Sequence, residues 1–129
     1  MTIYSIETTI KGNYKLILEK TKKELAVEGF GILTEINVRK TLKKKLGVDY
    51  QNYTILGACQ PQSAYQMLQK TQDVGLLLPC NVIVYENADS TVVVSAIKPT
   101  LAVKMIVKKS AKSLAENIER KLKKVIKRL

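Results

Sequence analysis

The two cysteines, Cys59 and Cys80, are the side chains best suited to chemistry in this sequence. Cys59 ends one predicted strand, and Cys80 begins the next strand along the chain. If these strands are antiparallel neighbours, both thiols lie at the same end of one sheet. Glu35, Gln60 and Asn81 could offer polar groups nearby. These five residues form the small-ligand site that the sequence predicts, on the strength of strand order.

Three roles are open to the two thiols. The first is packing, which we favour because free cysteine is among the most buried residue types. The second is redox or nucleophilic chemistry, which would require exposure and a lowered pKa. The third is a zinc site, which fits poorly because the chain has no histidine and no third cysteine. We therefore predict no metal, no other cofactor and no catalytic residue.

Glu35 is the second residue that could do chemistry. Simple strand alternation places its side chain on the sheet face opposite Phe30 and Ile32. If that face is covered, a buried carboxylate there would need partners such as Lys98 or backbone N–H groups. If it is not covered, Glu35 is an exposed residue near the end of a strand. An enzyme that uses Cys59, Cys80 or Glu35 stays open as an alternative function.

The net charge of +11 is concentrated near the C-terminus. Residues 104–129 hold ten basic and two acidic side chains, whereas residues 1–103 hold twelve and nine. The same C-terminal segment has apolar residues at helical spacing from Leu114 to Leu129. Burying such a stripe stabilises a fold by roughly as much as the whole net stability of a domain. We therefore expect a packed helix with a charged, solvated outer face.

This outer face suggests a second alternative function, the binding of nucleic acid. Its basic side chains could contact phosphates, and the candidates are Arg120, Lys123, Lys124 and Lys127. Aromatic rings for base stacking are scarce, since the chain has no Trp and one Phe. A solvated lysine-rich helix is the interpretation we favour. We expect no membrane partner, because the helix lacks the Trp and Phe side chains that insert at an interface.

The spacing of apolar and turn residues predicts an α+β fold, an antiparallel sheet with helices packed on it. Asn13 and Asn37 are expected to cap helices, and Gly47 to end the second of them. Residues 76–78, between Gly75 and Pro79, are expected to be a buried extended connection, while 100–109 are open between a helix and irregular chain. The expected strands are 2–9, 30–36, 53–59, 80–86 and 91–97, and the expected helices are 14–29, 38–46, one from 61, and one from 110 or 113 to the end.

The hairpin at 80–97 is apolar on both of its faces. A sheet that is covered on one side only should alternate more cleanly between apolar and polar residues. A second subunit, a ligand or the helices after the second and third strands could cover the other side, and we favour a homodimer.

The length suits one domain over residues 1–129, and no apolar run is long enough for a membrane span. We expect a cytoplasmic protein, because the N-terminus lacks signal-peptide features.

Three separated motifs, with two shorter stretches after them, match a known family in the same order. They are Gly29–Ile36, Leu56–Pro61 and Gly75–Val82, followed by 84–86 and 93–97. On these motifs, the sequence resembles the domain-of-unknown-function family numbered 302 over nearly its whole length. The resemblance implies an antiparallel sheet with packed helices in β-α-β4-α order, similar to the TATA-binding-protein-like fold, and it suggests a homodimer. It implies no activity. Lys98 departs from the acidic residue usual there, and residues 100–112 match poorly.

The function that the sequence favours is therefore a homodimeric module that binds, or senses, a small molecule. The site would lie at the Cys59 and Cys80 end of the sheet or at the dimer interface. Nothing in the sequence identifies the ligand.

Overall fold

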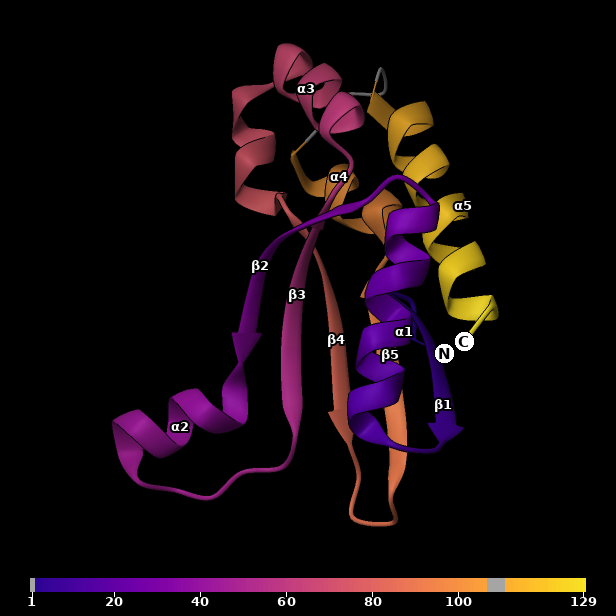
Figure 1. Ribbon diagram of the computed structural model, residues 1–129. Helices are drawn as coiled ribbons and strands as arrows, with labels where there is room; N and C mark the ends of the chain where they lie inside the picture. The colour runs from indigo at the N-terminus through magenta and orange to yellow at the C-terminus, as the bar shows by residue number, and fades with distance from the viewer. Residues whose placement is uncertain (1, 107–110) are drawn as a thin grey trace.

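A computed structural model of the chain describes residues 2–106 and 111–129. It contains a five-stranded antiparallel sheet with helices packed on it, as predicted, and the strand order is β1-β5-β4-β3-β2 (Figure 1). The elements are β1 (Ser5–Lys11), α1 (Tyr14–Val27), β2 (Gly31–Asn37), α2 (Val38–Leu46), β3 (Tyr53–Cys59), α3 (Pro61–Lys70), the 3-10 helix η1 (Gln72–Leu77), β4 (Cys80–Glu86), β5 (Thr91–Ile97), α4 (Pro99–Ile106) and α5 (Lys112–Lys127).

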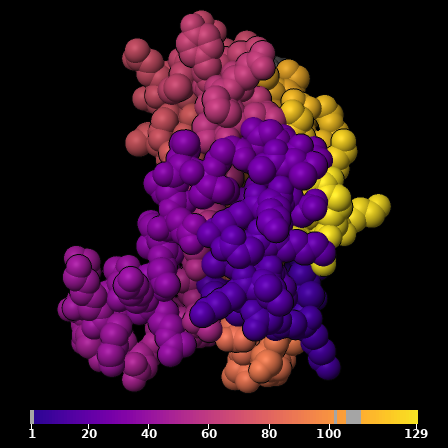
Figure 2. Space-filling view, viewed as in Figure 1, coloured from indigo at the N-terminus to yellow at the C-terminus, as the bar shows by residue number. Residues whose placement is uncertain are grey.

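Helices α1 and α2 begin where the sequence predicts, and α2 also ends as predicted, whereas α1 ends at Val27, two residues before the expected end. The side chains of Asn13 and Asn37 each accept a hydrogen bond of 3.0 Å from a backbone N–H in the first turn. Gly47 ends α2 with a φ of 69°, in the left-handed region that glycine adopts without strain. Although α2 is regular, none of its residues is buried, and it stands away from the body of the molecule (Figure 2).

The hydrophobic core lies between one face of the sheet and helices α1 and α5 (Figure 1). Leu25 on α1 and Leu122 on α5 are fully buried against Val84 and Val94 of the central strands. The final helix is therefore a core element with a solvated outer face, which confirms the prediction from its apolar spacing. Arg128 ties its end to α1 through ion pairs with Glu24 and, at 2.9 Å, with Glu28.

A β-bulge in β2 overturns the expected orientation of Glu35. Ile32 pairs with Ala58, but Leu33 is an extra residue, and Glu35 then pairs with Leu56. Because Ala58 and Leu56 lie on one face of β3, Ile32 and Glu35 also share a face, the one that the helices cover. Simple alternation placed Glu35 on the opposite face, and that prediction was wrong because one inserted residue reverses every later side chain.

Two connections also differ from, or extend, the expectation. Leu76 and Leu77 belong to the 3-10 helix η1 rather than to the predicted buried extended segment at 76–78, and Leu76 is 80% exposed. Residues 99–106 form helix α4, so residues 100–106, which the sequence left undecided between a helix and irregular chain, are helical. The rest of that region, 107–109, and the possible helix start at residue 110 lie outside the described residues. Within 2–106 and 111–129, no helix is both long and apolar enough to cross a membrane.

Candidate ligand-binding site

A cavity of about 460 Å³ opens at the end of the sheet where β4 begins. Its walls come from η1, the start of β4, the end of β5, α4, and one residue each of α3 and α5. These walls are mostly apolar, and typical members are Val74, Leu101 and Val103. Cys80 and Asn81 also line the cavity. A concave apolar space of this size with few polar groups is typical of small-molecule sites.

Gly57 allows the chain to close over β3 beside this cavity. A Cβ atom at Gly57 would lie 2.2 Å from Oγ1 of Thr34 and 2.7 Å from Cγ of Pro79. Real atoms do not approach so closely, so the side chains of Thr34 and Pro79 occupy the space that any other residue would fill. Because Gly57 has no side chain, Pro79, which lines the cavity, can pack directly on the sheet.

The two thiols lie at the same end of the sheet, as predicted, but on opposite faces. Cys80 pairs with Ala58 in the β3–β4 ladder, so it shares the helix-covered face, and it packs against the core. Cys59 follows Ala58 and therefore belongs to the other face. Of the two, Cys80 is the one that lines the cavity.

Both thiols are less acidic than an ordinary cysteine. Burial raises the pKa of Cys80 to about 11, and the neighbouring Cys59 adds to the shift. Burial also raises the pKa of Cys59. The thiolate is the nucleophilic form of cysteine, and a raised pKa makes it scarce near neutral pH. Cys80 therefore presents a neutral, weakly polar group to the cavity.

Glu35 and Gln60 lie outside the cavity and have partners of their own. The Glu35 carboxylate forms an ion pair with Lys22 of α1, with 2.7 Å between Nζ and Oε1. The Gln60 amide donates to the backbone oxygen of Glu28 at 3.2 Å, and its Oε1 accepts from Ser63 at 2.7 Å. These contacts join α1, β2 and α3. Of the five residues predicted from the sequence, the cavity brings together Cys80 and Asn81.

Much of the cavity wall comes from residues that were not predicted as site residues. Leu76 on η1 and Leu101 and Met105 on α4 all line it. A signal was present in the sequence, because 76–78 is an apolar run just before Cys80, and 101–106 is apolar except for Lys104. The two runs are more than twenty residues apart, so only the folded chain shows that they face one cavity.

Comparison with known proteins places this fold in a family. The family model "Domain of unknown function DUF302" matches residues 6–129. The chain belongs to the DUF302 family. A solved structure described as an uncharacterized conserved DUF302 protein from Bacillus stearothermophilus has a TM-score of 0.89 and 30% sequence identity. The similarity covers 98% of this chain and 98% of that one. No curated protein matches the chain.

In this DUF302 protein, the four basic residues predicted as a nucleic-acid site all lie exposed on α5. Lys123 is partly neutralised by Glu119, with 3.5 Å between Nζ and Oε2. Arg120 donates a hydrogen bond of 3.2 Å to Asn117. Lys124 and Lys127 project from the same outer side of the helix, opposite its buried stripe. This basic surface and the cavity are separate features of the molecule.

Proposed function

We propose that this DUF302 protein is a homodimeric module that binds a small, largely apolar molecule in the cavity between η1, α4 and the start of β4. The observation that carries the proposal is the cavity itself. It has a volume of about 460 Å³ and mostly apolar walls, and its few polar lining residues include Asn81. Sites for small ligands bury apolar surface and use a few polar groups to orient the ligand.

The chemistry of the cavity favours binding over catalysis. A thiol whose pKa is about 11 is protonated near neutral pH, so Cys80 is a poor nucleophile and a poor base. Glu35, which the sequence suggested as a possible catalytic residue, forms an ion pair with Lys22 and lies outside the cavity. We therefore propose reversible, non-covalent binding of an uncharged ligand or of the uncharged part of a larger one.

The second part of the proposal, the homodimer, rests on the sheet face that α1 and α5 leave open. The ladder places Ile36, Ile55 and Ile83 in one row across three strands of this face. Tyr53 and Tyr85 stack beside them, with ring centroids 5.3 Å apart and planes inclined by 8°. Ile36 is 46% exposed in the single chain. A contiguous row of large apolar side chains on a sheet is typical of a protein interface.

Binding of a neutral fluorescent probe tests the cavity. N-phenyl-1-naphthylamine fluoresces strongly in apolar surroundings, and we expect saturable binding at one site per chain. Leu76→Glu places a carboxylate at a lining position that is 80% exposed, and should weaken binding about fivefold or more because entry would desolvate the charge.

Leu16→Glu is the matched control for this experiment. It makes the same change at a residue on α1 that is 71% exposed and outside the cavity, so probe binding should stay as in the wild type. Equal loss in the two variants, or probe fluorescence that does not saturate, would contradict the proposed site.

A further inference from the structure

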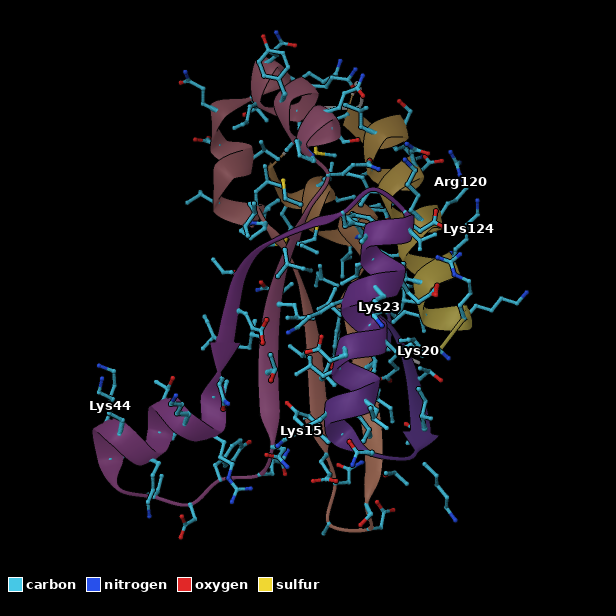
Figure 3. The ribbon with its side chains drawn as sticks, viewed as in Figure 1. Lys15, Lys20, Lys23, Lys44, Arg120 and Lys124 are labelled. Atoms are coloured by element: carbon cyan, nitrogen blue, oxygen red, sulfur yellow. The ribbon has the colours of Figure 1, made fainter. Side chains whose placement is uncertain are left out.

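Helices α1 and α5 together form a strongly basic outer surface. They hold ten basic and four acidic side chains. The two helices pack against each other on the same face of the sheet, and Arg128 joins their ends. Figure 3 shows Lys20 and Lys23 on α1, and Arg120 and Lys124 on α5, pointing outward from this two-helix layer. We refer to these four exposed residues as the basic ridge.

The acidic side chains near the ridge are largely occupied. Lys22 pairs with Glu19 at 3.2 Å and with Glu35, and Arg128 pairs with Glu24 and Glu28. Lys123 pairs with Glu119, whose pKa is lowered: burial opposes ionisation, but the hydrogen bond from Thr100 and the charge of Lys123 outweigh it. Among the described residues, no carboxylate lies within ion-pairing distance of the four ridge residues, which are Lys20, Lys23, Arg120 and Lys124. Their charge is therefore available to a partner.

We propose that the basic ridge binds the phosphate backbone of double-stranded nucleic acid without reading its base sequence. The ridge residues are spaced by three positions on α1 and by four on α5, so each pair lies on one side of its helix. Cations in such rows on two adjacent helices complement the closely spaced phosphates of a duplex. Phosphate contacts of this kind position a protein but carry no sequence information.

Two observations select a duplex over a single strand or a membrane. Single strands are held by base stacking on aromatic rings, and Tyr14, the aromatic residue of α1, is turned inward, with its hydroxyl 2.6 Å from Oγ1 of Thr54. Insertion into a membrane surface requires an accessible apolar helix face. The apolar face of α5, with Ile118, Leu122 and Val125, is buried in the core.

Fluorescence anisotropy with a labelled 20-base-pair DNA of arbitrary sequence tests this inference on the full chain. At 25 mM salt we expect micromolar affinity that is the same for a second, unrelated duplex. The logarithm of the binding constant should fall linearly with that of the salt concentration, with a slope of about −3 to −4 for four phosphate contacts.

Two variants with the same change in charge decide whether the ridge is the site. The ridge variant, which carries Lys20→Gln, Lys23→Gln, Arg120→Gln and Lys124→Gln, should lose at least tenfold in affinity and most of the salt slope. The control variant removes three lysines and one arginine from exposed positions of α2, and should keep both within about twofold. Its substitutions are Arg39→Gln, Lys40→Gln, Lys44→Gln and Lys45→Gln.

Three results would overturn the inference. The first is the absence of duplex binding at 25 mM salt, and the second is an equal loss in the two variants, which would reflect net charge alone. The third is binding to vesicles of phosphatidylserine and phosphatidylcholine that persists while duplex binding is absent. Circular dichroism of each variant shows whether a loss of affinity comes from unfolding.

Discussion

At the scale of single residues, the chemistry of this protein is set by burial and by partners. Cys80 lies half-buried against the core at the edge of the cavity, and its pKa is raised to about 11. The Glu35 carboxylate, exposed enough to contact solvent, is held by Lys22. Both residue types suggest reactivity from the sequence. In the fold, the thiol is protonated and the carboxylate is paired, so they shape the surface without supplying a nucleophile or a base.

The raised pKa of Cys80 predicts a specific pH dependence of its alkylation. In Cys59→Ser, Cys80 is the single thiol and keeps the burial that is the larger cause of its raised pKa. Its rate of reaction with iodoacetamide in the native protein should therefore rise several-fold between pH 9 and 10, since the thiolate fraction is still growing there. In urea, where an ordinary thiol is already half ionised near pH 9, the rise should be much smaller. A native rate that levels off by pH 9 would contradict the pKa.

The same shift adds a contribution to stability with a defined sign. Because the folded state favours the protonated thiol, the contribution is complete below about pH 9 and is lost as the pH rises toward 11. Urea unfolding of Cys59→Ser against Cys59→Ser/Cys80→Ala should therefore show the single variant losing relative stability across this range.

At the scale of elements, the parts that the sequence predicted best are those with a complete local signal. The strands 53–59, 80–86 and 91–97 and the α2 boundaries match because alternation, Asn caps and Gly47 act within a few residues. The bulge at Leu33 and the 3-10 helix η1 were missed. Both depend on how distant segments pack, because Thr34 and Pro79 meet over Gly57 and Val74 is buried against the core.

The prediction of the site was limited for the same reason. Strand order was enough to bring Cys80 and Asn81 to the correct end of the sheet. The sheet face on which Cys59 lies depends on the strand register, which was not predicted. The cavity walls from η1 and α4 depend on how two segments distant in the sequence fold together, and neither segment has a local sequence pattern that indicates a binding site.

Gly57→Ala tests whether the connection after η1 is held down on β3. The new methyl group would overlap Oγ1 of Thr34 and Cγ of Pro79, and overpacking of this kind costs about 1–3 kcal/mol. We expect that loss in urea unfolding together with weaker binding of N-phenyl-1-naphthylamine, since Pro79 lines the cavity. Gly75→Ala is the control, because nothing lies within 4 Å of its added Cβ. Equal effects of the two substitutions would contradict the packing at Gly57.

At the scale of the whole molecule, three surfaces have different characters. The cavity at one end of the sheet is apolar, the outer layer of α1 and α5 is basic, and the open sheet face carries isoleucine and tyrosine side chains. Helix α2, which contacts β2 and β3, adds Leu46 as a further large apolar side chain that is 69% exposed. The basic layer lies on the sheet face opposite the proposed dimer interface, so a dimer through the open face would leave it accessible.

Ile55→Glu tests the proposed dimer interface. Ile55 occupies the middle of the isoleucine row on the open face, and a carboxylate there would have to be buried unpaired in the dimer. Light scattering after gel filtration should give twice the chain mass for the wild type and for Leu16→Glu, and the single-chain mass for Ile55→Glu. A monomeric wild type, or a dimeric Ile55→Glu variant, would exclude this interface.

The most direct test of the cavity as a ligand site is a crystal structure of the protein with N-phenyl-1-naphthylamine bound. Our account predicts the naphthyl ring between η1 and α4, in contact with Val74 and Leu101. A ring bound on the open sheet face or on the basic layer, while the cavity holds none of the probe, would contradict it.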